Sequence, residues 1–372
     1  MDLDSQQEGI VKLAAEQKDP EHNSKMMRFY SFIVITAVSL ISSCQDSNVF
    51  DCEATLVTAE NEVSISGEEM VLTGGPFIGG ISDIQAVDSF LVIKASAKEC
   101  PDFLYVYNTD NGRFAGSFLT KGRGENESIT PIYGSTYLNT SGRQSLYLFD
   151  LSSGLSYGFD VNESVTDGTT QLLSLGRMPS STLYANPIHD SLHFARYPQP
   201  DGIVGELIDG KGTVKKKISV YPSISGYDYF SNLSSADAVF TGSSTIAMAM
   251  LNLPQINILD ISSGERRTYA VGKSYKHWKK IFTEGEQTMY YMGATASDRY
   301  LFTLYYGVPI LDWVHGNFIS HIHIFSKDGH FIYDITLSEK IEALTYDRAS
   351  TCLYGADQDD RIYRYDLSEL NL

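Results

Sequence analysis

The chain has 372 residues, of which 42% are hydrophobic, and it carries a formal net charge of −18. An acidic field of this size repels phosphate backbones, so the composition argues against a nucleic-acid partner. The 24 tyrosines and 18 phenylalanines suit β-strands that bury one face.

The N-terminal part is typical of an exported protein. Residues 1–25 are polar and without an apolar period, and we interpret them as a disordered extension or a mis-assigned start. Residues 26–43 have the layout of a signal peptide, with the positive Arg28 ahead of the apolar run 29–41. Because this run is too short to span a bilayer core of about 30 Å as a helix, we expect it to be removed on export.

The end of this segment, Leu40-Ile41-Ser42-Ser43-Cys44, resembles the lipobox of bacterial lipoproteins. That resemblance implies that Cys44 takes a diacylglycerol and becomes the new N-terminus. Residues 44–53 would then tether the lipid to the folded body. We therefore expect a cell-envelope protein that is lipid-anchored to the outer membrane, facing the periplasm or the exterior. An ordinary secretory signal with an incidental cysteine is the alternative.

Three more cysteines, Cys52, Cys100 and Cys352, have no spacing typical of a metal or redox site. Their odd number means that they cannot all pair, and it stays open whether two of them form a disulfide. Cys352 lies in an apolar stretch, where a small buried residue is expected.

One short pattern recurs six times within residues 54–372. Apolar residues alternate with others, which marks a strand with one buried face, and a Gly-containing turn follows each of the first five copies. A strand precedes each copy and another follows each of the first five, so the unit is an antiparallel meander of about 50 residues, as in one four-stranded propeller blade. The copies are Leu104–Asn108, Leu146–Asp150, Gly205–Asp209, Ile256–Asp260, Ile322–Ser326 and Ile362–Asp366.

This repeat predicts an all-β fold, a six-bladed β-propeller in which each copy is the third strand of its blade. The sixth unit stops after that strand. The segment Ala54–Thr73 is spare and strand-like. We expect it to supply the missing outer strand of the last blade and so remove an exposed sheet edge. A β-sandwich or an open array of hairpins is the alternative.

The segment Lys121-Gly-Arg-Gly-Glu-Asn-Glu127 is similar to a Gly-rich loop, Lys-Gly-x-Gly-x-x-Glu, of a known family. Together with Cys44 and the repeat, it makes residues 54–372 resemble the TolB-like six-bladed propeller lipoproteins of Bacteroidetes-type bacteria. Glu125 stands where that family commonly has proline. The resemblance implies a surface or periplasmic lipoprotein of unknown biochemical role, and it assigns no catalytic residue.

Propellers usually bind ligands in the central channel or on the face that carries the connections between blades. Three cations, Arg123, Arg177 and Lys273, each follow a glycine in such connections. A ring of cations could recognise carboxylates or sulfates, since guanidinium groups match planar anions. The alternative is that each cation pairs with an acid of the next blade.

The fifth unit carries a long aromatic insertion, residues 305–317, between its second and third strands. Such a loop is a binding candidate because aromatic rings stack on sugars or apolar ligands. A lid packed against its own blade is the alternative. The candidate ligand-binding residues here are Tyr305, Tyr306, Trp313 and His315, with Tyr227 and Tyr229 at the border of the same site.

The sequence shows no catalytic motif, so we expect no catalytic residue and no cofactor. His321 and His323 point the same way on one strand, and without a third ligand we interpret them as solvent-side histidines rather than as metal ligands. The predicted function is a membrane-anchored lipoprotein that binds a glycan, a peptide or an envelope protein. The alternative is a metal-dependent hydrolase, lactonase or lyase that uses the central channel.

Overall fold

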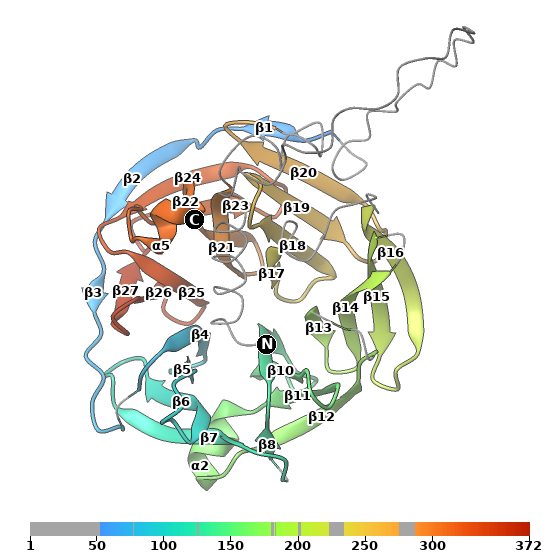
Figure 1. The fold of residues 1–372 in the computed structure, drawn as a ribbon, viewed down its shortest axis with the longest axis vertical. Helices are drawn as coiled ribbons and strands as arrows, with labels where there is room; N and C mark the ends of the chain where they lie inside the picture. Colours follow the sequence, from blue (N-terminus) through green and yellow to red (C-terminus); the bar gives the residue numbers. More distant parts are fainter. Residues whose placement is uncertain are drawn as a thin grey trace, which may run out of the picture. The chain divides into compact units, whose positions relative to one another are not determined.

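The computed structural model describes residues 53–372 except 77, 125, 180–181, 183, 200–201, 223–233 and 275–286. The chain divides into two units, Met1–Ser47 and Asn48–Leu372, and all the described residues lie in the second. They form six small sheets arranged in a ring, so the predicted six-bladed propeller is confirmed (Figure 1). In the described part of the chain, no helix is both long enough and apolar enough to cross a membrane.

Each blade is a meander whose first strand lies nearest the ring centre (Figure 1). Among the described residues, two short helices interrupt the strands, α2 (Val161–Asp167) in blade 2 and α5 (Ile310–Val314) in blade 5. Blade 1 contains β4 (Ile81–Val87), β5 (Phe90–Ala95), β6 (Asp102–Asn108) and β7 (Phe114–Lys121), with β8 (Glu127–Ser128) beside β7, and blade 2 contains β9 (Pro131–Leu138), β10 (Gln144–Asp150), β11 (Leu155–Phe159) and β12 (Leu172–Arg177). Blade 3 contains β13 (Tyr184–His189), β14 (Leu192–Gln199), β15 (Gly202–Asp209) and β16 (Val214–Pro222), and blade 4 contains β17 (Ser235–Val239), β18 (Thr245–Met250), β19 (Gln255–Asp260) and β20 (Arg266–Val271). Blade 5 contains β21 (Thr288–Ala296), β22 (Tyr300–Pro309), β23 (His321–Ser326) and β24 (Phe331–Leu337), and blade 6 contains β25 (Ile341–Asp347), β26 (Cys352–Asp357) and β27 (Ile362–Asp366).

The alternating strand directions give the ring two distinct loop faces. The inter-blade face carries the connections from one blade to the next and from second to third strands, including residues 122–124, 272–274 and 310–320. The hairpin face carries the opposite turns, including residues 109–113 and 327–330.

The second copy of the repeat occupies a different strand from the one predicted. Leu146–Asp150 lies in β10, the second strand of blade 2, whereas the third strand is β11, Leu155–Phe159. The prediction was wrong because any half-buried strand followed by a tight turn fits the pattern. In blade 2 that turn joins the second and third strands, and α2 occupies the next connection instead. The turn at Ser152–Gly154 therefore lies on the inter-blade face.

The N-terminal segment runs along the outer edges of blades 4, 5 and 6, as the blue strands in Figure 1 show. β1 (Thr55–Val57) pairs in parallel with β20, and β2 (Asn61–Ile65) pairs in parallel with β24. β3 (Glu68–Glu69) pairs antiparallel with β27 as the fourth strand of blade 6, so the predicted closure is confirmed. The segment covers three sheet edges, although only one needed a strand.

This belt, residues 55–73, continues from blade 6 to blade 1. The backbone N–H of Met70 donates to the Ile362 carbonyl at 2.8 Å, and that of Thr73 donates to the Gly112 carbonyl at 2.9 Å. Thr73 also pairs with Arg113, directly before β7, the fourth strand of blade 1. The belt therefore ties the last blade to the first through its backbone.

Replacing Gly112 by alanine tests the junction of the belt with blade 1. Gly112 has a φ of 67°, and a Cβ there would overlap the Val71 carbonyl oxygen. We expect the free energy of unfolding to fall by about 2–4 kcal/mol, because the substitution adds a clash to left-handed strain. The matched control is Gly142→Ala, with a φ of 77° and no atom near its Cβ, which should cost about 1–2 kcal/mol from strain alone. Equal losses in urea denaturation would show that the belt contact adds nothing.

The seams between neighbouring blades are mainly apolar layers. In the seam between blades 4 and 5, Ala249 and Ile256 from blade 4 pack with Leu301 and Phe325 from blade 5. Cys352, a free cysteine, is fully buried in blade 6, as expected for a small core residue. Because both faces of every blade are covered in this way, a polar side chain in a seam needs a partner.

One ion pair is buried in the seam between blades 3 and 4. Arg196 of β14 contacts Asp237 of β17 at 2.6 Å between guanidinium and carboxylate, and both side chains are almost fully buried. Ser235 accepts a hydrogen bond from Arg196 at 3.0 Å and donates one to Asp237 at 2.7 Å. The guanidinium also lies over the ring of Tyr184, at 4.7 Å. This network joins the two blades through polar contacts.

Candidate functional site

The three predicted cations all have exposed side chains on the inter-blade face. Arg123 follows β7, Arg177 ends β12 and Lys273 follows β20. Arg177 donates to the carbonyl of Ser153 at 2.8 Å, a contact within its own blade rather than with an acid of the next. Their binding of an anionic ligand stays a prediction.

The Gly-rich loop after β7 folds around its own glutamate. The backbone N–H of Gly124 donates to the Glu127 carboxylate at 2.6 Å, and the N–H of Gly122 donates to the Ser128 carbonyl at 2.9 Å. A Cβ on Gly122 would overlap the Glu127 carboxylate, so a larger residue there would displace that side chain from its hydrogen bond to Gly124. The loop carries Arg123 with an exposed side chain.

The aromatic insertion packs onto the propeller. Tyr306 and Trp313 are only 4% and 6% exposed, so the expectation that these rings project toward a ligand is wrong. The hydroxyl of Tyr306 donates to the Ile341 carbonyl of blade 6 at 2.7 Å, and its ring centroid lies 4.7 Å from that of Phe318. The long insertion buries its aromatic rings because they close the end of the seam between blades 5 and 6. His315 remains exposed beside α5.

Tyr305 points the opposite way from Tyr306, as neighbours on a strand do, and therefore faces blade 4. It is partly buried, and its ring stacks on His323 with centroids 4.1 Å apart. Burial and the nearby Asp334 raise the pKa of Tyr305, while the charge of Lys273 opposes this rise. Tyr305 thus lies in the seam between blades 4 and 5, and the charge of Lys273, after β20 of blade 4, acts on it.

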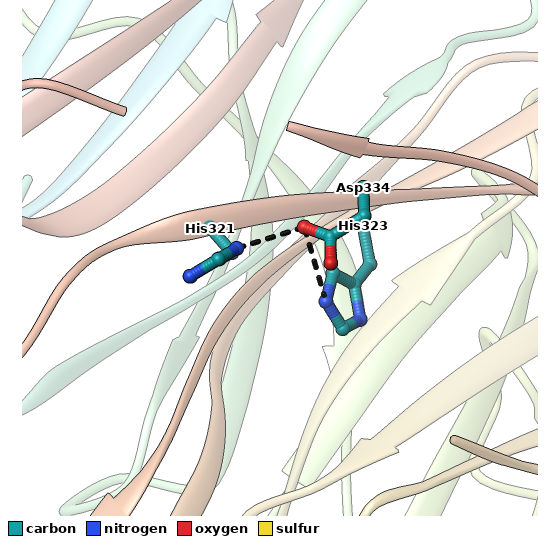
Figure 2. A group of neighbouring side chains, drawn as sticks. All are labelled: His321, His323 and Asp334. Atoms are coloured by element: carbon teal, nitrogen blue, oxygen red, sulfur yellow. Dashed lines mark hydrogen bonds and ion pairs between the residues drawn. The ribbon is translucent and has the colours of Figure 1, made fainter. Parts of the chain in front are cut away.

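Two histidines and an aspartate gather in the same seam (Figure 2). His321 and His323 lie on β23, and the strand register places Asp334 of β24 directly opposite His323. The Asp334 Oδ1 atom lies 2.8 Å from His321 Nδ1 and 3.7 Å from His323 Nε2. We call these three residues the seam cluster.

The seam cluster combines a buried neutral imidazole with an ionised carboxylate. His323 is 1% exposed, and burial lowers its pKa to about 3, so its ring is uncharged at pH 7. Burial by itself would raise the pKa of Asp334, but the hydrogen bond from His321 and the two neighbouring imidazoles outweigh it and lower the pKa. The expectation of two solvent-side histidines is therefore wrong for His323, because its ring packs among Tyr291, Tyr305 and Phe331 in the seam with blade 4.

The third member, Asp334, was missed at the level of sequence, although a signal was present. The turn Asp328-Gly329 predicts a tight hairpin, and a hairpin fixes which residues of its two strands oppose each other. Counting outward from the turn places an acid of the fourth strand near the His-x-His pair. A β-bulge between Ile324 and Phe325 makes this count uncertain by one residue.

The seam cluster is the one group of three metal-ligating side chains that the described residues bring together. It lies in a seam between blades and not around the central channel. The described residues bring no such group together at the channel. Cys44, Tyr227 and Tyr229 lie outside the described residues.

Comparisons with solved structures support the fold. The chain superposes with a TM-score of 0.52 on a Bacteroides fragilis protein described as exported, at 12% identity, covering 84% of this chain and 99% of that one. It matches a member of the DUF4221 family from Bacteroides vulgatus equally well, with a TM-score of 0.52 and 13% identity over 83% and 97% of the two chains. No protein-family model and no curated protein sequence matches this chain.

Proposed function

We propose that this protein is an exported lipoprotein, anchored through Cys44, that binds a ligand or partner protein on its inter-blade face at blades 4 and 5. The observation that carries the binding site is the partly exposed Tyr305 ring stacked on His323 of the seam cluster, near enough to the exposed Lys273 for its charge to act on the tyrosine. The exposed Lys273 and the partly exposed Tyr305, His321 and Asp334 offer stacking, charge and hydrogen bonds to one ligand. A glycan, a peptide or an envelope protein has the groups to use them.

Export and anchoring are supported by the sequence that precedes the propeller. A positive residue, an apolar run and small residues lead to Cys44, as in lipoprotein signal peptides. The structural neighbour from Bacteroides fragilis is itself described as exported. A lipid anchor on Cys44 would hold the propeller at the membrane while leaving its loop faces free to meet a partner.

Site-specific photo-cross-linking in living cells tests the binding face. A benzophenone amino acid at Lys273, exposed beside Tyr305, should capture a partner or a glycan chain on irradiation, as a shifted band identified by mass spectrometry. The matched control is Lys211, exposed on the hairpin face in the turn before β16, which should capture at least about tenfold less. The expectation rests on proximity, since the photoproduct forms only with groups within a few ångströms.

Tyr305→Ala in the chain that carries the cross-linker at 273 should reduce the capture, because the stacking surface is lost. Equal capture from both loop faces, or none from position 273, would reject the inter-blade face of blades 4 and 5 as the binding surface.

A further inference from the structure

The Asp334 carboxylate lies between the ring nitrogens of His321 and His323 at 2.8 and 3.7 Å, and the three ligand atoms lie within 4.8 Å of one another. Ligand atoms around a tetrahedral ion with bonds of 2.0–2.2 Å stand about 3.4 Å apart. The two distances to Asp334 bracket that value, and the two histidine nitrogens lie within 4.8 Å of each other, so side-chain rotations that bring the histidines together would place all three atoms around one ion.

We propose that the seam cluster binds a divalent transition-metal ion of the zinc class. This deepens the proposed function, since the ion would lie in the seam where the ligand is expected, next to Tyr305. Two imidazoles and one carboxylate are a ligand set for zinc, copper, nickel or ferrous iron rather than for magnesium or calcium, which take oxygen ligands.

The strongest independent sign of a cation is the unpaired nitrogen of His323. Its Nε2 atom is buried and has no hydrogen-bond partner, although it faces the Asp334 carboxylate. Its other nitrogen, Nδ1, lies 3.3 Å from the Tyr291 hydroxyl. When Nδ1–H donates to that hydroxyl, Nε2 turns a lone pair toward a carboxylate, so two acceptors face each other with no proton between them. A metal ion satisfies both.

Metal-ligating histidines usually donate their second N–H to a fixed acceptor, which orients the ring. The hydroxyl of the fully buried Tyr291, on β21, lies 3.3 Å from His323 Nδ1 and can accept that hydrogen bond. Tyr305 stacks on the His323 ring from β22, and Phe331 contacts it from β24 with centroids 4.7 Å apart. The imidazole is therefore held by three of the four strands of blade 5 and is preorganised for an ion.

The ligands also differ in exposure, in a way that leaves part of the ion accessible. The His321 and Asp334 side chains are 26% and 28% exposed, whereas His323 is buried. Three protein ligands with an accessible side are typical of metal sites that hold a water or a substrate group, while closed structural sites have four protein ligands. The open side would accept an oxygen or nitrogen atom of the ligand beside Tyr305.

Calorimetric titration of the full-length, untagged lipoprotein in detergent, stripped with EDTA, tests the proposal with Zn²⁺ as the probe. We expect one Zn²⁺ ion per chain for the wild type and no competition from excess Mg²⁺. Asp334→Asn and His323→Phe should each weaken binding at least about 100-fold, and Tyr291→Phe should weaken it about 10- to 100-fold. His330→Ala, an exposed histidine in the β23–β24 turn, is the matched control and should bind as the wild type does.

The partly exposed Asp334 keeps the test informative if the buried His323→Phe variant fails to fold. An absence of saturable Zn²⁺ binding to the wild type overturns the proposal, and so does unchanged affinity in Asp334→Asn. Zn²⁺ binding without capture at position 273 keeps the metal site and rejects the ligand face. Capture at position 273 without Zn²⁺ binding keeps the ligand face and rejects the metal site.

Discussion

Replacing Arg196 by methionine should lower the free energy of unfolding by about 3–5 kcal/mol, because it leaves the Asp237 carboxylate buried without its counter-charge. Replacing both residues, as in Arg196→Met with Asp237→Leu, should restore much of the loss, since two apolar side chains fill the seam without desolvating a charge. Urea denaturation of the single and double variants measures both effects.

The matched control is the pair of Lys215 and Asp209, which are 2.8 Å apart with the lysine half exposed. Lys215→Met should change the free energy of unfolding by less than about 1 kcal/mol, because solvent screens a surface ion pair. A similar small loss in Arg196→Met would show that the buried pair does not join blades 3 and 4.

The pH dependence of the Arg196→Met variant gives a second readout. Burial already raises the pKa of Asp237 even beside Arg196, and removal of the guanidinium should raise it further. A carboxyl whose pKa is higher folded than unfolded takes up a proton on folding, so its destabilisation appears as the pH rises. The variant should therefore lose stability from about pH 4 upward, where an unfolded aspartate ionises, more steeply than the wild type does.

Replacing Cys44 by serine should abolish lipidation. Metabolic labelling with an alkyne analogue of palmitate should mark the wild-type protein and leave the variant at background. Each buried methylene contributes about 0.8 kcal/mol, so losing several acyl chains removes stable membrane binding. Cys52→Ser, eight residues downstream, is the matched control and should label as the wild type does.

An uncut signal peptide could itself hold the Cys44→Ser chain in the membrane. A second variant therefore carries an ordinary secretory signal, cut before Gln45, and should appear in the soluble envelope fraction. Labelling that survives Cys44→Ser, or membrane retention of the second variant, would contradict the lipid anchor.

Much of the fold could be predicted because strand alternation and tight turns are local properties. Five of the six repeat copies lie on the predicted third strands, and the missing fourth strand of blade 6 comes from the N-terminal segment, as expected. The copy at Leu146–Asp150 was misplaced because the pattern does not distinguish one half-buried strand of a meander from the next.

The candidate site could be predicted only in part. Tyr305 and Lys273 were identified from the aromatic insertion and from a connection between blades. The structure places Tyr305 in the seam between blades 4 and 5, where the charge of Lys273 acts on it. Tyr306 and Trp313 were expected to project but are buried, because whether an aromatic side chain meets solvent or a neighbouring blade depends on contacts distant in sequence. Asp334 was missed because its approach to His321 and His323 depends on the pairing of two strands.

By itself, the amino-acid sequence determined the strand repeat, the number of blades, the closure of the ring and the signal-like segment that ends at Cys44. These follow from periodicity and turn chemistry, which act between neighbours in the chain. Only the tertiary structure decided that both faces of each blade are covered, and hence that His323 is buried opposite Asp334 while Tyr305 faces blade 4. The physical reason is that burial and the meeting of polar groups depend on how separate sheets pack, and that packing is not encoded in any short stretch of the chain.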